Sequence, residues 1–163
     1  MEIEKKFLIR EMPDLSAYEK KEIEQGYLCV NPVVRIRKSN DRYILTYKSK
    51  QGTGDAERLE AQVNREVEVP LNEEGYLHLR EKVDEHLIQK SRYLIPLPDG
   101  QTGELDVFHG LLSGLVFIEV EFADEEDAAA FLPPDWFGEN VSKDKRYSNS
   151  FLSKCGDLSV FSE

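Results

Sequence analysis

Charged residues recur at alternate positions in several segments of this 163-residue chain. In an extended strand, residues two apart point to the same face, so each such pair places two charges side by side. Two like charges about 4 Å apart repel by about 4 kcal/mol at an effective dielectric of about 20, and a bound ion of opposite sign relieves this repulsion. The segments are Glu2-Ile3-Glu4-Lys5-Lys6, Arg35-Ile36-Arg37, Glu66-Val67-Glu68, Lys90-Ser91-Arg92, Glu104-Leu105-Asp106 and Glu119-Val120-Glu121.

The two signs of charge suit two kinds of ligand. Carboxylate pairs suit hard divalent cations, which prefer oxygen ligands. Arginine and lysine pairs suit phosphate oxygens, because arginine donates two parallel hydrogen bonds and lysine acts as a compact charge. Together the pairs predict a metal-dependent site for a polyanion. The alternative for any single pair is a strand face in contact with solvent.

Composition limits the remaining classes of function. The chain has 32 acidic and 21 basic residues and a formal net charge of −11, which argues against a nonspecific nucleic-acid-binding protein but allows a local basic site. No apolar run approaches the roughly 18 residues of a membrane span, and the charged N-terminus does not resemble a signal peptide. Cys29 and Cys155 form no metal or redox motif and are predicted to be free thiols. We therefore expect a cytoplasmic protein of one domain, residues 1–163, without a membrane partner.

Alternating polar and apolar residues predict eight strands, and the short turns between several of them favour antiparallel pairing. Asn40-Asp41 is typical of a tight hairpin turn. The predicted strands are Glu2–Arg10, Glu22–Val30, Val33–Ser39, Arg42–Ser49, Leu59–Val69, Leu87–Ile95, Thr102–His109 and Leu115–Phe122. Capping residues predict helices from Asn72 to about Asp84, over Glu125–Leu132 after Asp124, and from Tyr147 or Ser148 to Cys155 before Gly156.

Two architectures accommodate strands with one charged face. In a sandwich, the apolar faces pack together and the charged faces contact solvent. In a closed barrel, the charges line the interior and helices cover the apolar outside, and eight strands leave room for one small ligand. The residue pattern by itself favours the sandwich.

The N-terminal segment is similar to the ExExK signature of the CYTH superfamily, the triphosphate tunnel metalloenzymes. The segments 133–141 and 144–149 resemble the small bacterial members of that family, and the resemblance covers roughly Met1 to Leu152. The other charged pairs follow in the family's order: Arg35-x-Arg37, Thr46-x-Lys48, Glu66-x-Glu68, Lys90-x-Arg92-Tyr93, Glu104-Leu105-Asp106 and Glu119-x-Glu121.

This resemblance implies a mainly β (α+β) fold, an eight-stranded antiparallel β-barrel with covering helices that forms a triphosphate tunnel. The implied activity is Mg²⁺- or Mn²⁺-dependent hydrolysis of inorganic tripolyphosphate to pyrophosphate and phosphate by a monomer or homodimer. The implied partner is a small anionic triphosphate, with no nucleic acid. Alternatives are a class IV-type adenylyl cyclase, a thiamine or nucleoside triphosphatase, or a non-catalytic polyphosphate- or nucleotide-binding module.

The resemblance also implies site residues. The catalytic group is Tyr27, Lys6 and Glu4, with Tyr27 orienting the attacking water or accepting its proton; a tyrosine packed in the barrel is the alternative. By strand parity, Lys5, Lys38 and Arg65 point away from the interior. The implied phosphate-binding residues are Lys6, Arg35, Arg37, Lys48, Lys90, Arg92 and Arg146. The implied metal ligands are Glu2, Glu4, Glu66, Glu68, Asp106, Glu119 and Glu121, with Glu104 as a further candidate.

Overall fold

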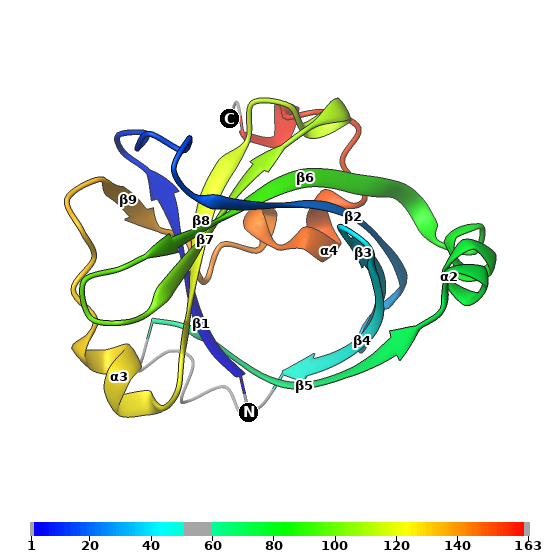
Figure 1. Ribbon diagram of the computed structural model, residues 1–163, viewed down its shortest axis with the longest axis horizontal. Helices are drawn as coiled ribbons and strands as arrows, with labels where there is room; N and C mark the ends of the chain where they lie inside the picture. Colours follow the sequence, from blue (N-terminus) through cyan, green and yellow to red (C-terminus); the bar gives the residue numbers. More distant parts are fainter. Residues whose placement is uncertain (1, 51–59, 162–163) are drawn as a thin grey trace.

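The computed structural model describes residues 2–50 and 60–161, whose strands form a closed barrel. Nine strands belong to one antiparallel sheet in the order β5-β4-β3-β2-β6-β7-β8-β1-β9. Strand β5 also pairs with β1, so eight strands close into a ring and β9 lies outside it (Figure 1). The predicted eight-stranded barrel is confirmed, and the sandwich is wrong. Closure leaves no open edge among the eight strands and turns their charged face inward.

The predicted strands are present with small shifts at their ends. Strands β2 and β6 each begin three residues earlier than predicted, and the predicted start of β5 at Leu59 lies outside the described residues. The short strand β9 was not predicted because its four residues do not alternate in polarity. The strands are β1 (Glu2–Ile9), β2 (Glu19–Val30), β3 (Val33–Ser39), β4 (Arg42–Lys50), β5 (Gln62–Leu71), β6 (Asp84–Pro96), β7 (Thr102–Phe108), β8 (Val116–Phe122) and β9 (Phe137–Asn140).

The strand register places charges from neighbouring strands side by side inside the barrel. Lys6 lies directly opposite Glu119, and Glu4 lies opposite Glu121, across the β1–β8 pair. The β3–β4 register is set by the predicted two-residue turn, in which Asn40 has a φ of 51°. Because the side-chain period of a strand is two, this register decides which residues line the interior, called the bore below.

All three predicted α-helices are present but shorter than expected. Helix α2 (Glu73–Arg80) begins at the predicted cap, where the Asn72 side chain accepts a hydrogen bond from the Gly75 N–H (2.6 Å), and it ends before Asp84, which begins β6. Helix α3 is Glu125–Ala130 and α4 is Asn149–Leu152, and the 3₁₀ turns are η1 (Gly110–Leu112), η2 (Lys145–Tyr147) and η3 (Ser159–Phe161). No helix in the described part of the chain is long and apolar enough to cross a membrane.

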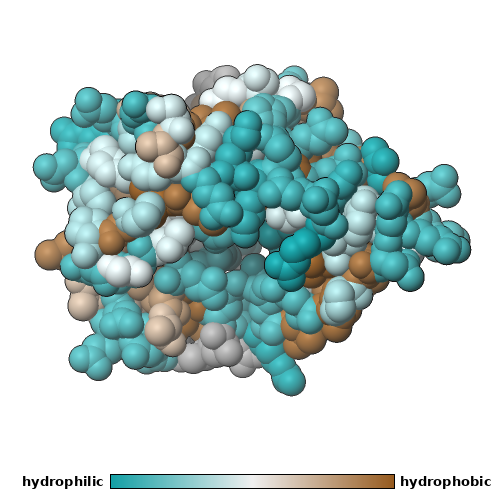
Figure 2. Space-filling view, in the orientation of Figure 1, coloured by the Kyte–Doolittle hydropathy of each residue, from teal (hydrophilic) through white to brown (hydrophobic). Residues whose placement is uncertain are grey.

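Two apolar clusters support the barrel from different sides. The first lies outside β1, β7 and β8, where Phe7 packs against Phe131 and Phe137 beside α3 and β9. The second contains inward-facing Phe117 together with Tyr147, and it includes Leu152 of α4. The C-terminal segment that contains α4 therefore packs against residues of the bore. The remaining interior is charged, and Figure 2 shows hydrophilic surface around the hollow at the centre of this face.

Candidate functional site

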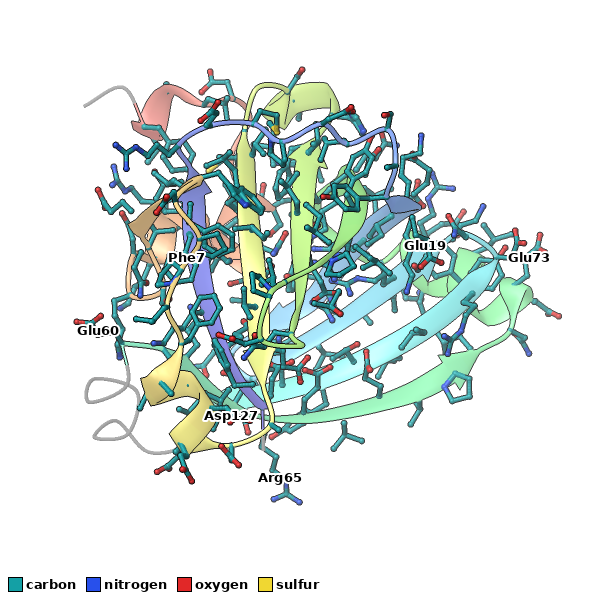
Figure 3. The ribbon with its side chains drawn as sticks, turned by 60° about the vertical axis from the view of Figure 1, so that its left-hand side comes forward. Phe7, Glu19, Glu60, Arg65, Glu73 and Asp127 are labelled. Atoms are coloured by element: carbon teal, nitrogen blue, oxygen red, sulfur yellow. The ribbon has the colours of Figure 1, made fainter. Side chains whose placement is uncertain are left out.

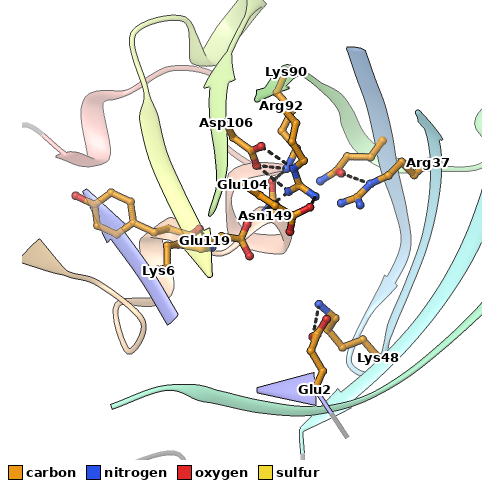
Figure 4. A network of polar contacts seen from close by, with 12 residues as sticks. Glu2, Lys6, Arg37, Lys48, Lys90, Arg92, Glu104, Asp106, Glu119 and Asn149 are labelled. Carbon is orange, nitrogen blue, oxygen red and sulfur yellow. Dashed lines mark hydrogen bonds and ion pairs between the residues drawn. The ribbon is translucent and has the colours of Figure 1, made fainter. Parts of the chain in front are cut away.

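A buried carboxylate joins two cations on the wall of the bore formed by β6 and β7. Asp106 accepts two hydrogen bonds from Arg92, from Nε (2.8 Å) and Nη2 (2.9 Å), and its Oδ2 lies 2.8 Å from Lys90 Nζ (Figure 4). Burial raises the pKa of Asp106, but Arg92 and Lys90 outweigh it, so the pKa lies below its ordinary value. Burial lowers the pKa of Lys90 to about 7 although Asp106 opposes this shift. Asp106 thus holds Lys90 and Arg92 side by side.

Arg92 links this wall to the carboxylates of neighbouring strands. Its Nη1 lies 3.2 Å from Glu104 Oε2, and its Nη2 lies 3.7 Å from Glu119 Oε1. Burial lowers the pKa of Arg92, but Asp106 and Glu104 raise it well above the ordinary value. Burial also opposes ionisation of Glu119, yet Lys6 and Arg92 hold its pKa far below the ordinary value. Arg92 and Glu119 are therefore charged at neutral pH.

The wall formed by β2, β3 and β4 holds its arginines with uncharged oxygen atoms. Arg37 Nε donates to Gln25 Oε1 (2.9 Å), and Arg35 Nη2 donates to Thr46 Oγ1 (3.2 Å). The Thr46 hydroxyl in turn donates to Glu68 Oε2 (3.3 Å). Burial, followed by repulsion from Arg35 and from Arg92 on β6, lowers the pKa of Arg37 to about 9. This wall therefore concentrates positive charge.

A third group of charges lies where β4, β5 and β1 meet. Lys48 Nζ is 3.0 Å from Glu2 Oε1 and 3.7 Å from Glu66 Oε2. Burial and a hydrogen bond with Glu66 raise the pKa of Glu2 to about 7. Burial lowers the pKa of Lys48, but Glu4 and Glu2 raise it above its ordinary value. Lys48 thus lies among carboxylates rather than in a purely basic patch.

Carboxylates of β1 and β8 crowd one another and fit a hard cation. Burial, followed by repulsion from Glu119, raises the pKa of Glu4 to about 8, and burial and Glu2 raise the pKa of Glu121. Oxygen donors that disfavour one another's ionised forms are suited to Mg²⁺ or Mn²⁺, whose charge favours ionisation. Within residues 2–50 and 60–161, no three Asp, Glu, His or Cys side chains are placed to hold an ion by themselves. Mg²⁺ commonly keeps several waters and needs only one or two protein carboxylates, so a cage of protein side chains is not required.

Lys6 and Tyr27 lie where the charged bore meets the second apolar cluster. Lys6 Nζ donates to the Tyr147 carbonyl (2.6 Å) and lies 4.4 Å from the centroid of the Phe117 ring. Tyr27 is buried in that cluster, yet it is close enough to Arg37 to interact with it electrostatically. Packing and a position beside the basic groups of the bore are therefore compatible for Tyr27, and its catalytic role stays a prediction.

Three predicted site residues are more exposed than the buried charges described above. Arg146 pairs with Asp144 (2.6 Å) and stacks over Tyr147 and Phe161, so the structure does not join it to the other basic residues. Glu68 and Glu121 are exposed, unlike the buried Glu119. The phosphate contact of Arg146 and the metal contacts of Glu68, Glu121 and Asp106 stay predictions.

Three basic residues predicted by strand parity to point outward do lie outside the bore. Lys5 Nζ donates to the Ala128 carbonyl beneath α3 (2.8 Å), and Lys38 Nζ lies over the Tyr43 ring. Arg65 points away from the barrel (Figure 3). Gln25 was not among the predicted site residues, because an uncharged amide gives no charge signal. Its position two residues before Tyr27 on β2, and hence on the same face, was the available clue.

Comparison with known proteins agrees with this architecture. The CYTH domain family model matches residues 1–148, and the chain belongs to this family. An inorganic triphosphatase of Nitrosomonas europaea is 39% identical over 155 residues, covering 93% of this chain and 96% of the relative. One from Acetivibrio thermocellus is 38% identical, covering 94% and 93%. A crystal structure of an inorganic triphosphatase superposes with a TM-score of 0.67 at 38% identity and covers 95% of each chain.

Proposed function

We propose that this protein is an inorganic triphosphatase that hydrolyses tripolyphosphate to pyrophosphate and phosphate with Mg²⁺ or Mn²⁺ as its cofactor. The main support is the convergence of Arg35, Arg37, Lys90 and Arg92 inside a closed barrel that also contains crowded carboxylates. A linear triphosphate carries several negative charges in a narrow chain, so it suits a bore lined in this way. The curated relatives, both named inorganic triphosphatase, match over nearly the whole chain.

The basic residues bind and orient the phosphate chain. Arg35 and Arg37 present guanidinium groups that engage phosphate oxygens through paired hydrogen bonds. Lys90 and Arg92 are held in place by Asp106, so little reorganisation is needed when charge develops on the leaving pyrophosphate. Lys6 uses one of its three N–H donors on the Tyr147 carbonyl, which leaves two for the substrate.

The carboxylates supply the metal-binding side of the site. Candidate ligands of a divalent cation are Glu2, Glu4, Glu119 and Glu121, of which one or two would contact the ion directly, with Glu66 near Glu2 as a further oxygen donor. When bound, such a cation neutralises phosphate oxygens and lowers the pKa of a coordinated water. Tyr27, beside Arg37, would orient the attacking water towards the terminal phosphorus. The mechanism is an in-line displacement in which positioning and electrostatics provide most of the catalysis.

A phosphate-release panel tests this proposal. Purified protein is incubated with tripolyphosphate, thiamine triphosphate or ATP, with Mg²⁺, with Mn²⁺ or with EDTA, and the products are separated. We expect pyrophosphate and phosphate from tripolyphosphate in both metals and none in EDTA. Cyclic AMP from ATP would identify a cyclase instead. Metal-independent binding of tripolyphosphate without hydrolysis would identify a non-catalytic binding module.

A further inference from the structure

The cations of the bore differ in the kind of group that holds them. Lys90 and Arg92 contact the carboxylate of Asp106, and Lys48 contacts that of Glu2. Arg37 instead donates to the amide oxygen of Gln25. A carboxylate partner neutralises the cation that it orients, whereas an amide orients it and leaves its charge in place. The β2–β3 wall therefore retains positive charge that the β6–β7 wall has partly lost.

Gln25 occupies a fixed position beside Arg37. The two residues lie directly opposite each other in the β2–β3 register, and the Gln25 side chain is fully buried. A guanidinium group only donates hydrogen bonds, so the amide oxygen must face Arg37 and the amide nitrogen must face elsewhere. That nitrogen, Nε2, is buried and has no partner within the described residues; the same is true of Arg35 Nε on the adjacent strand.

Two unpartnered buried donors on one charged wall point to an acceptor ligand. Buried N–H groups in folded proteins are nearly always hydrogen-bonded, so their isolation needs a specific explanation. Arg37 is repelled by Arg35 and by Arg92, so the ligand must also be anionic. A phosphate group satisfies both conditions, because its oxygens accept several hydrogen bonds and carry negative charge.

We propose that Gln25 positions Arg37 through its amide oxygen and binds a phosphate group of the substrate through its amide nitrogen. Because the Gln25 amide is uncharged, it does not neutralise the positive charge of Arg37. Arg37 should therefore bind a phosphate group more strongly than an arginine paired with a carboxylate would. This assignment rests on the proposed triphosphatase function, which it extends by one substrate-binding residue.

Two substitutions separate the electrostatic role from packing. Gln25→Glu preserves size and the acceptor facing Arg37 but adds a neutralising charge and removes the Nε2 donor. Gln25→Met removes both polar atoms at similar volume. Gln89→Glu is the matched control, because Gln89 is exposed on β6 and gives the same change in net charge outside the bore. Tripolyphosphate binding is measured by calorimetry in EDTA at pH 8, and thermal unfolding of each variant is followed by circular dichroism.

The proposal expects a distinct pattern among the three variants. At pH 8, Gln25→Glu should weaken tripolyphosphate binding at least tenfold, Gln25→Met several-fold, and Gln89→Glu less than twofold. Gln25→Glu should weaken binding more than Gln25→Met does, because it adds a carboxylate that neutralises Arg37 as well as removing the donor. A role confined to packing predicts the reverse order, because glutamate is closer to glutamine in shape than methionine is.

Three results would overturn the proposal. Both Gln25 variants could bind as wild type does, Gln25→Glu could lose no more affinity than Gln89→Glu or Gln25→Met, or the losses could follow lowered thermal stability. If Gln25→Glu does not fold, Gln25→Met decides: weaker binding at unchanged thermal stability supports the proposal, and unchanged binding refutes it. Because binding is measured without turnover, the result is independent of whether wild type hydrolyses tripolyphosphate, which the phosphate-release panel tests.

Discussion

Asp106 binds Arg92 through two parallel hydrogen bonds, from Nε at 2.8 Å and from Nη2 at 2.9 Å, while its Oδ2 also contacts Lys90. All three side chains are buried. A carboxylate committed to two cations in this way has a structural task that is separate from metal binding. It allows two positive charges to remain adjacent in the interior before any substrate arrives.

Asp106→Asn should destabilise the protein because it leaves two buried cations with too little negative charge. Removing one partner of a buried ion pair costs about 3–5 kcal/mol. We therefore expect a loss of that size in the free energy of unfolding, measured by urea denaturation at pH 7. The matched control is Asp144→Asn, which breaks the partly exposed pair with Arg146 and should leave stability nearly unchanged. Equal losses in the two variants would contradict the structural role of Asp106.

Arg37→Ala should lower turnover of tripolyphosphate while the fold survives. Removing one preorganised donor to developing charge reduces kcat by about 100-fold to 1,000-fold in other hydrolases. The measurement is phosphate release under saturating metal, with circular dichroism as a check on folding. Arg65→Ala removes an arginine on the outside of the barrel and should change turnover less than about twofold (Figure 3). Near-wild-type turnover in Arg37→Ala would remove Arg37 from the site.

Glu4→Gln should reduce metal-supported turnover. If Glu4 supplies an oxygen to the cation, its neutralisation should cost about 2.7 kcal/mol or more, which is about 100-fold in rate. Initial rates are measured as Mg²⁺ or Mn²⁺ is added back to EDTA-treated protein, and the variant should need more metal to reach its maximum. Glu139→Gln changes an exposed carboxylate on β9 and serves as the control. An unchanged metal titration in Glu4→Gln would exclude Glu4 as a ligand.

Lys90 should make anion binding depend on pH near neutrality. Its pKa in the folded protein is lowered to about 7, so its positive charge is present below that pH and is lost as the pH rises through it. Bound anion favours the charged form and moves the transition to higher pH, but affinity in the metal-free protein should still fall between pH 6 and 9. Lys90→Met removes this titrating group.

The measurement is tripolyphosphate affinity in EDTA across this range for wild type and Lys90→Met. The affinity of wild type is divided by that of Lys90→Met at each pH, which removes the effect of ionisation of tripolyphosphate itself. That ratio should decline as the pH increases, because only wild type has a charge at this position to lose. A ratio that stays constant would show that Lys90 does not titrate in this interval.

The amino-acid sequence by itself determined which side chains share a face of each strand. Alternation has a period of two residues, so the outward positions of Lys5, Lys38 and Arg65 followed from parity, and the Asn40 turn followed from local backbone preference. The caps at Asn72 and Asp124 were predictable for the same reason: each cap bonds to a backbone N–H only three residues away.

Only the tertiary structure decided what those faces enclose. Sandwich and barrel share the same local alternation, and they differ through the pairing of β1 with β5, which brings Glu2 beside Asn64. Side-chain partners across the bore depend on that closure as well. Asp106 matched the carboxylates of the metal-ligand pattern in sequence, yet folding placed it between two cations, and folding gave Gln25 its arginine partner. Such contacts join residues from separate strands, so no local pattern specifies them.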